Sequence, residues 1–260
     1  MARYPISPLL IVVVSTLAPG CNSQDATQPT EISAASPAVA QQLTPSTAAV
    51  SKLPPFPGPG GFVDVIDNPY FPLQPGTRFV YLGMDSTDPL KNVTDITHLD
   101  KTILGVKVVV VLDRVFISGL LAEKTFDYYA QDRDGNVWYL GEDTKEYDPS
   151  GNVISTAGTF QAGRNGAKAG IIMRAHPKVG ETTQQEFAPG VAEDLGTVVS
   201  LDATVTVPYG KFHRCLESKD FTPLEPGAKE IKYYCRGIGF VKGRDISGGS
   251  VHMALTSITH

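Results

Sequence analysis

The sequence contains little of what metal, redox or nucleic-acid chemistry requires. Among its 260 residues only three are Cys, five are His and one is Trp. The His residues lie far apart, without the short spacing of zinc ligands, so we expect no metal site built on them. With 22 Lys and Arg against 27 Asp and Glu, the formal net charge is −5. Because an acidic chain does not attract a phosphate backbone, we expect no nucleic-acid partner.

Motifs of several enzyme classes and long hydrophobic runs are also missing. The sequence has no Gly-x-Ser-x-Gly elbow and no Walker loop, so we name no catalytic residue and predict no cofactor. The longest aliphatic run, residues 9–14, is too short to span a bilayer permanently. It follows Arg3 and precedes small residues, which is the order of a secretory signal. We therefore assign residues 1–21 to a signal peptide and expect an exported protein.

The end of this segment points to a lipid anchor. Residues 17–21 read Leu-Ala-Pro-Gly-Cys and resemble a bacterial lipobox, in which the Cys becomes the lipidated first residue of the mature protein. Pro19 departs from the usual pattern, and an ordinary signal peptide cleaved nearby is the alternative. In such lipoproteins a second residue other than Asp implies the outer membrane, and here it is Asn22. The resemblance implies membrane attachment through Cys21 and a place in the cell envelope, at the outer membrane or in the periplasm.

A low-complexity tether separates this signal from the rest of the chain. Of the 40 residues in the range 22–61, 23 are Ala, Ser, Thr or Pro, and Phe56 is the only aromatic residue. Such a stretch buries too little apolar surface to offset the entropy lost on ordering, so we predict that it is disordered. The remaining residues, 62–260, have the length of a single β domain.

The pattern of residues 62–260 is that of β-strands. Alternation is clearest over residues 199–207, where Val199 and Val207 share a face with three other apolar residues and polar residues occupy the opposite face. Residues 108–112 are apolar on both faces, as in a central or covered strand. No 3.6-residue apolar stripe lasts three turns. We predict an all-β fold, an antiparallel meander of about ten strands that forms a curved sheet, half-barrel or barrel.

A hairpin is predicted around residues 132–136, which read Asp-Arg-Asp-Gly-Asn between two aromatic-rich strands. Alternation places Tyr128 and Tyr129 on opposite faces, and likewise Trp138 and Tyr139. One residue of each pair is therefore expected in the core and the other at the surface or in a cavity. We predict that Trp138 faces the concave interior, because a large indole is costly to leave in water.

Two Cys residues remain once Cys21 is assigned to the anchor. Symmetric pairing about position 225 places Cys215 opposite Cys235, with the turn over residues 221–229. In an exported protein an even number of Cys favours a disulfide over buried thiols or metal ligands. We therefore predict a bond between Cys215 and Cys235.

The densest polar patch is the predicted hairpin itself. Residues 127–148 hold seven acids against two bases, and aromatic residues interleave with them. Carboxylates beside aromatic faces can hold a sugar by stacking and hydrogen bonding. Glu186, Glu193 and Asp194 add three carboxylates farther along the chain; two acids across a cleft could cleave a glycosidic bond, but surface carboxylates are the favoured interpretation. The candidate ligand-binding residues are Tyr128, Trp138, Tyr139, Glu142, Glu186 and Glu193.

Two other interpretations concern the same region. Asp132, Asp134 and Asn136 imitate the start of an EF-hand, which makes Ca²⁺ a weak alternative, but the Gly falls two positions early and a solvated turn is favoured. The Gly-rich residues 158–170 are expected to form a long loop over one barrel mouth, with a lid as the alternative.

Two segments carry a resemblance to a known family. Residues 70–76, Tyr-Phe-Pro-Leu-Gln-Pro-Gly, resemble the opening of a family of bacterial exported proteins and lipoproteins without a settled activity, and residues 128–142 resemble its central hairpin. The similarity spans about residues 68–245. More distantly, these proteins are similar to periplasmic half-barrels that carry lipoproteins or lipids. The resemblance implies a curved sheet that cups an apolar ligand.

Three functions remain open at this point. The leading hypothesis is an exported, lipid-anchored envelope protein whose β domain binds an apolar or amphipathic ligand, such as a lipid or hydrophobic small molecule, without catalysis. The second is a glycan-binding or glycan-cleaving protein that uses the patch over residues 126–148. The third is a structural surface lipoprotein with no small ligand.

Overall fold

The computed structural model describes residues 50–260, so the predicted signal peptide, Cys21 and residues 22–49 lie outside the described part. Its regular structure is one 3-10 turn, η1 (Pro59–Gly61), and 17 strands, with no α-helix in the described chain. Eleven strands have six or more residues, close to the predicted number. The strands are β1 (Phe62–Val63), β2 (Arg78–Asp85), β3 (Asp88–Ile96), β4 (Lys101–Ile103), β5 (Val106–Ile117), β6 (Leu120–Asp132), β7 (Val137–Tyr147), β8 (Val153–Ser155), β9 (Phe160–Gln161), β10 (Lys168–Met173), β11 (Thr182–Gln184), β12 (Glu186–Phe187), β13 (Leu195–Val207), β14 (Gly210–Thr222), β15 (Glu225–Cys235), β16 (Gly239–Ser247) and β17 (Val251–Thr259).

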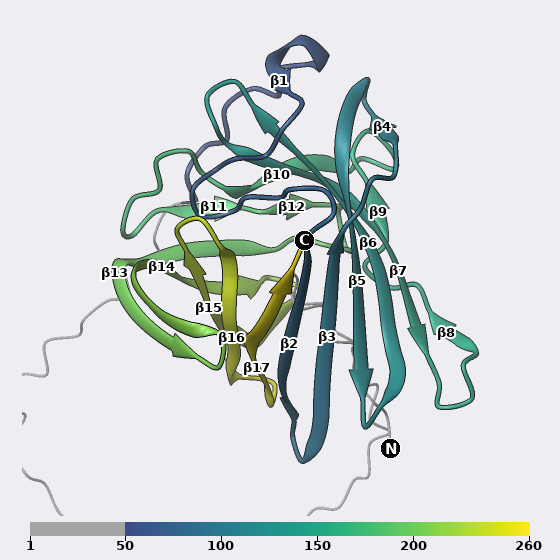
Figure 1. Ribbon diagram of the computed structural model, residues 1–260. Helices are drawn as coiled ribbons and strands as arrows, with labels where there is room; N and C mark the ends of the chain where they lie inside the picture. The colour runs from purple at the N-terminus through teal and green to yellow at the C-terminus, as the bar shows by residue number, and fades with distance from the viewer. Residues whose placement is uncertain (1–49) are drawn as a thin grey trace, which may run out of the picture.

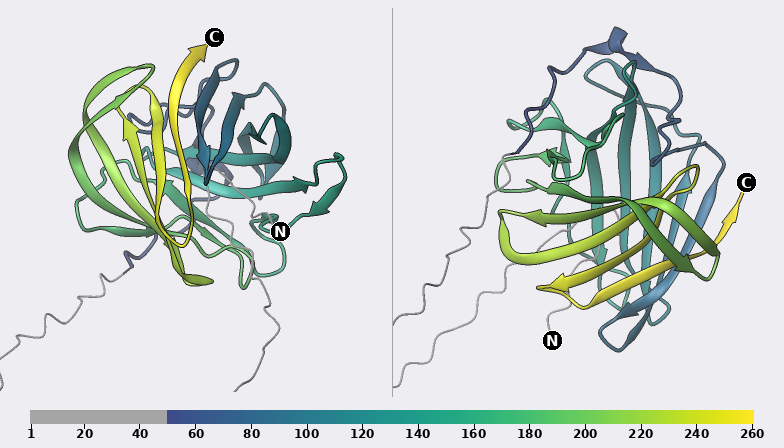
Figure 2. Two further views of the ribbon diagram at one scale, coloured as in Figure 1. Left: turned by 90° about the horizontal axis from the view of Figure 1, so that it is seen from below. Right: turned by 90° about the vertical axis from the view of Figure 1, so that its left-hand side faces the viewer.

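The strands form one antiparallel sheet that curls into a nearly closed barrel (Figure 1). Strands β2 to β7 make one wall and β13 to β17 the other, and β17 pairs with β2 to join them. On the opposite side β7 pairs with β10, β10 with β12, and β11 with β13. Seen from below, the two walls enclose a ring (Figure 2). The predicted all-β antiparallel meander is confirmed.

The barrel has one hydrophobic core inside and another outside. The inner core draws residues from both walls. The outer core lies on the convex side of β5, β6, β7 and β10. Strand β5 contributes to both, because Val108 and Val110 face outward and Val111 faces inward. This double burial is why residues 108–112 are apolar on both faces.

The outer core is covered by residues 50–61, which we call the strap and which composition had assigned to the disordered tether. The Ser51 amide donates to the Thr182 carbonyl at 2.7 Å. The Phe56 ring meets Trp138 edge-on, with ring centroids 5.5 Å apart. The ordered chain therefore begins before the predicted boundary. A few apolar contacts, those of Leu53 and Phe56 with the outer core, suffice to order the strap. The average composition of the 40 predicted tether residues does not reveal them.

The prediction that Trp138 faces the concave interior is wrong. Trp138 and Tyr128 belong to the outer core, whereas Tyr129 and Tyr139 belong to the inner one. All four are at most 5% exposed, so neither pair leaves a member at the surface. The indole N–H of Trp138 donates to Asp132 at 2.7 Å. Because the strap covers this part of the convex face, the Trp138 indole is excluded from solvent although it points outward.

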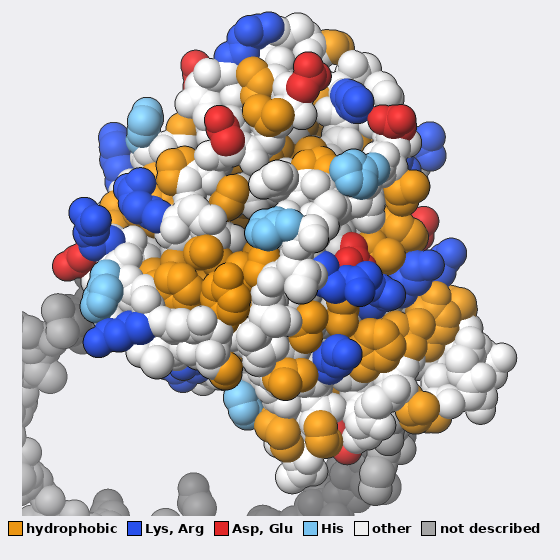
Figure 3. Space-filling view, viewed as in Figure 1, with side chains coloured by type: hydrophobic (Ala, Val, Ile, Leu, Met, Phe, Trp, Pro, Cys, Tyr) orange, Lys and Arg blue, Asp and Glu red, His pale blue; other side chains and the backbone are white. Residues whose placement is uncertain are grey.

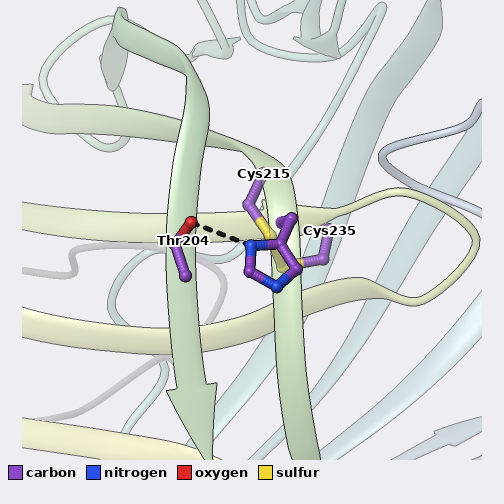
Figure 4. Close-up of a disulfide and its surroundings, with 4 residues drawn as sticks. Thr204, Cys215 and Cys235 are labelled. Atoms are coloured by element: carbon purple, nitrogen blue, oxygen red, sulfur yellow. Dashed lines mark hydrogen bonds between the residues drawn. A yellow bond between two sulfur atoms is a disulfide. The ribbon is translucent and has the colours of Figure 1, made fainter.

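Cys215 of β14 and Cys235 of β15 form a disulfide, with Cα atoms 4.3 Å apart. Figure 4 shows the bond close to β13, whose Thr204 hydroxyl forms a hydrogen bond of 3.1 Å with His213. Both Cys residues are buried in the inner core. In the chain-entropy model, closing a loop of this length stabilises the fold by about 3 kcal/mol.

Two local predictions need correction, and both fail at β-bulges. Leu216 pairs with Tyr234 as expected, but β15 already begins at Glu225, because the register shifts after Phe221. The turn is thus shorter than residues 221–229. In β13, the register shifts around Val199 leave that residue 43% exposed rather than buried.

Candidate functional site

A β-bulge at Gly141 decides which side chains of β7 point into the barrel. Tyr129 pairs with Tyr139, but Tyr128 pairs with Gly141, so β7 carries one extra residue. Gly141 has φ 144°, and a Cβ there would lie 2.4 Å from the Phe160 carbonyl oxygen, so only Gly fits. Beyond the bulge the inward positions change from odd to even numbers. They are Glu142, Thr144 and Glu146, all buried.

Three rows of directly paired residues cross the inner face of the β2–β7 wall. Paired residues share a face of the sheet. The rows are Tyr81–Asn92–Val115–Glu123–Glu146, Phe79–Thr94–Asp113–Thr125–Thr144 and Ile96–Val111–Asp127–Glu142. Five carboxyl groups therefore lie inside, and each of these residues is at most 6% exposed. The acids of the hairpin were expected to bind a ligand or to face solvent, and these instead form part of the barrel interior.

Tyr139 connects two of these carboxyl groups. Its hydroxyl lies 2.7 Å from Asp127 Oδ1 and 3.2 Å from Glu142 Oε2, while its ring stacks on Tyr129 with centroids 4.7 Å apart. Burial raises the pKa of Asp127 to about 7. Burial, and then the charge of Asp127, raise the pKa of Glu142 well above its usual value. The pair therefore holds at least one proton at neutral pH.

Further acids extend this pair into what we call the inner acid network: Asp113, Glu123, Asp127, Glu142, Glu186 and Asp194. Burial raises the pKa of Glu186, and the nearby charges of Asp194 and Glu142 raise it further. Burial likewise raises the pKa of Asp113 and Glu123. Four of the acids carry an oxygen without a hydrogen-bond partner among the described residues: Glu123, Asp127, Glu142 and Glu186. Protonation is the way such groups avoid the cost of buried charge.

A second charged cluster lies on the inner face of the opposite wall. Lys232 of β15 is 1% exposed, and its Nζ is 3.2 Å from Asp220 Oδ2 and 3.2 Å from Glu230 Oε2. Burial alone would lower the pKa of Lys232, but the charges of Glu230 and Asp220 outweigh it and raise this pKa. Burial raises the pKa of Glu230 to about 8. Lys232 is thus the cation that balances this end of the interior.

The carboxylates do not assemble a metal centre. Within residues 50–260, no group of three or more His, Cys, Asp or Glu residues is placed to hold a metal ion. Among the residues proposed as Ca²⁺ ligands, Asp132 forms the hairpin turn. Its carboxylate accepts hydrogen bonds from the backbone amide and the side chain of Asn136 and from the Trp138 indole. Asp134 is exposed beside it. Asp132 thus forms the turn as expected, but at 5% exposed it is buried rather than solvated.

An open pocket of about 460 Å³ lies beside β7, between β9 and two loops. Its apolar side includes Tyr128, Phe160, Ala188, Pro189 and Val191, and its polar side Lys101, Glu142, Asp143, Gln161 and Arg164. The Lys101 ammonium sits 4.1 Å above the Tyr128 ring centroid. The Gly-rich residues 158–170 are not one long loop, because they include β9 and the start of β10; they supply part of the rim through β9 and the turn that follows it. By contrast, the apolar cavity between Phe71, Tyr81 and Phe240 measures only about 30 Å³.

The structure brings together only part of the predicted ligand-binding set. Tyr139, Glu142 and Glu186 meet in the inner acid network, and Glu142 and Tyr128 line the pocket. Trp138 is held in the outer core. Glu193 accepts the Gly190 amide at 2.8 Å in a loop.

Several functional candidates were missed by the sequence analysis. They are Asp113 and Glu123 in the network, Lys232 with its partners, and Lys101 and Arg164 at the pocket. Alternation along β5 and β6 places Asp113, Glu123 and Asp127 on one face with Val111 and Tyr129, and that signal could have found the network.

Comparisons with known proteins add a weak likeness of shape. No protein-family model and no curated protein matches the chain. Among solved structures, a candidate exported protein with a YmcC-like fold from Bacteroides fragilis is 14% identical, with a TM-score of 0.39, and the match covers 74% of this chain and 99% of that one. A candidate lipoprotein from Parabacteroides distasonis is 12% identical, with a TM-score of 0.40, covering 73% and 98%. Among the described residues, no helix is long and apolar enough to cross a membrane.

Proposed function

We propose that the protein is an exported, lipid-anchored envelope protein whose β domain binds an amphipathic ligand without catalysis. The pocket of about 460 Å³ beside β7 carries this proposal. Its size falls within the range of small-molecule sites. The signal-like residues 1–21 and the disulfide, a bond typical of oxidising compartments, support the export.

The lining favours an amphipathic ligand over a purely apolar one. Tyr128, Phe160 and Val191 offer apolar area, while Arg164 and Asp143 offer charges of both signs at the same opening. Inside the barrel, aromatic rings and the inner acid network occupy the space that an apolar chain would need. Of the apolar or amphipathic ligands that the sequence indicated, we therefore propose only the amphipathic ones. A saccharide is the second candidate, because acids stand beside two aromatic rings here.

Lipidation is tested by Cys21→Ser. We expect the wild-type chain to fractionate with membranes and the variant to be soluble with an unchanged thermal midpoint, since residue 21 is far in sequence from the ordered domain. Metabolic labelling with an acyl analogue should mark only the wild type. Equal membrane fractions for the two proteins, or an unlabelled wild type, would show that Cys21 is not the anchor.

The pocket is tested by Val191→Glu, with Val179→Glu as its matched control. Both Val residues are exposed, at 47% and 62%, but only Val191 lines the pocket. A carboxylate on the apolar side must be desolvated when an apolar group binds. We expect Val191→Glu to weaken binding of the fluorescent probe N-phenyl-1-naphthylamine about tenfold and Val179→Glu to leave it unchanged.

Native mass spectrometry of the purified full chain then identifies the ligand class. A co-purifying lipid-like molecule that is lost in Val191→Glu supports the proposal. Equal probe binding by both variants contradicts the pocket. A co-purifying saccharide would establish the second candidate instead.

A further inference from the structure

The outer face of the β2–β7 wall, opposite the inner acid network, combines apolar and basic side chains in paired rows. The rows are Leu82–Lys91–Phe116–Leu121, Val80–Val93–Arg114–Lys124–Lys145 and Arg78–Asp95–Leu112–Phe126–Asp143. We call this surface the basic face. Figure 3 shows hydrophobic and basic side chains gathered side by side over β2, β3 and β5.

No described segment covers the basic face. The outer core beneath the strap reaches it only at Phe126, and its other residues lie farther along the strands. Leu82 is 50% exposed and Phe116 and Leu112 are half-buried, whereas Val93 in the middle row is 7% exposed. An outward sheet face in water normally carries polar residues, so this apolar content indicates a partner.

The charge of the basic face is opposite to that of the chain. Its three rows hold five bases and two acids, a net +3, whereas the whole chain has −5. Asp95 is already paired with both Arg78 and Arg114. Lys91 and Lys145 are exposed, and Lys124 lies over the Phe126 ring, 5.0 Å from its centroid. Lys side chains that cover apolar surface and extend their charge outward are suited to a lipid–water interface.

The protein surface as a whole is also basic, although the sequence is acidic. Residues 50–260 contain 21 bases and 25 acids, of which one base, Lys232, and ten acids are buried. The exterior is left with 20 bases and 15 acids, a net +5. An acidic sequence thus presents a basic surface, because ten of its acids are buried, most of them inside the barrel.

We infer that the basic face docks on the surface of an anionic lipid bilayer. Each Lys or Arg near such a surface is attracted to it, and exposed apolar side chains such as Leu82 enter the headgroup region. The inference goes beyond the proposed pocket and gains from the proposed anchor, which would hold the domain near a membrane. The 28 residues between Cys21 and Val50 span at most about 100 Å, enough for the face to reach the bilayer.

The test uses the full chain with Cys21→Ser, so that binding does not depend on the anchor. Vesicles contain phosphatidylcholine alone or with about 30 mol % phosphatidylglycerol. We expect co-sedimentation with the anionic vesicles only, and its loss at about 0.5 M salt. Lys91→Glu/Lys145→Glu should weaken it about tenfold.

Lys178→Glu/Lys211→Glu is the control, because it changes the total charge equally at exposed sites outside the basic face. It should weaken binding less than about threefold. A second pair carries no charge change: Leu82→Gln should weaken binding, whereas Leu224→Gln, at a residue 42% exposed in the β14–β15 turn, should not. Thermal midpoints confirm that all four variants fold.

Several results would overturn the inference. These are absent binding to anionic vesicles, equal losses for the two charge-reversed pairs, or equal effects of Leu82→Gln and Leu224→Gln. Crosslinking of the basic face to an acidic protein in cells, without vesicle binding, would assign the face to a protein partner instead. None of these results depends on whether the pocket binds a ligand or Cys21 is lipidated.

Discussion

Replacing Lys232 with Met is expected to lower the free energy of unfolding by about 3–5 kcal/mol. Met keeps much of the side-chain volume but removes the ammonium that lies 3.2 Å from Asp220 and from Glu230. Those carboxyl groups are at most 6% exposed, so neither can turn to water once the ammonium is removed. Urea denaturation at neutral pH measures the loss.

Lys229→Met is the matched control, since Lys229 lies on the same strand but is exposed. It should change stability by less than about 0.5 kcal/mol. A triple variant that adds Asp220→Asn and Glu230→Gln to Lys232→Met should recover most of the loss, because it leaves no buried charge unpaired. Similar losses for Lys232→Met and Lys229→Met would contradict the role given to the buried ion pairs.

Replacing Asp127 with Asn is expected to raise the free energy of unfolding at pH 8 on the order of 4 kcal/mol. Burial raises the pKa of Asp127 from 3.8 to about 7, so the folded state holds a proton that the unfolded state releases. At pH 8 the folded wild type must bury the ionised Asp127 carboxylate, whereas the Asn side chain of the variant is neutral. The Asn oxygen can still accept the hydrogen bond from Tyr139.

The sign of the pH dependence follows from the same shift. Below about pH 4, Asp127 is protonated in both the folded and the unfolded state and does not lower the free energy of unfolding of the wild type. As the pH rises from there, the free energy of unfolding falls, and the full loss is reached above about pH 7. Denaturation curves between pH 4 and 8 should therefore converge for wild type and Asp127→Asn at the acid end. Asp134→Asn, at an exposed acid of the hairpin turn, should follow the wild type throughout. A wild type that gains stability relative to Asp127→Asn as the pH rises would contradict the buried carboxyl group.

The strands could be predicted from sequence because period-2 patterns and turn residues act locally. The hairpin at Asp132–Asn136 and the pairing of Leu216 with Tyr234 both depend on residues close in the chain, and both are present. The bulge at Gly141 is different. It depends on the close approach of the Phe160 carbonyl, which belongs to a distant strand, so the shift in alternation along β7 leaves no local sign.

The candidate site was harder to predict, because it depends on which acidic side chains the fold removes from solvent. Carboxylates are rarely buried alone, so the sequence offered no reason to expect Glu186 and the hairpin acids inside the barrel rather than at a ligand site or in solvent. In the fold Asp127 and Glu142 both contact the Tyr139 hydroxyl, and their raised pKa values make burial tolerable. The strap escaped prediction for a related reason: the outer core that Phe56 covers exists only after β5, β6 and β7 have assembled.

The pairing of β17 with β2 has a consequence for how the chain acquires its structure. Strand β17 follows every other strand of the sheet in the sequence, so it is synthesised after all of them. Until it pairs with β2, one wall of the barrel is missing its neighbour, and the acids on the inner face remain hydrated and ionised. Proton uptake by these acids therefore belongs to the final stage of maturation, when the seam closes and water leaves the interior.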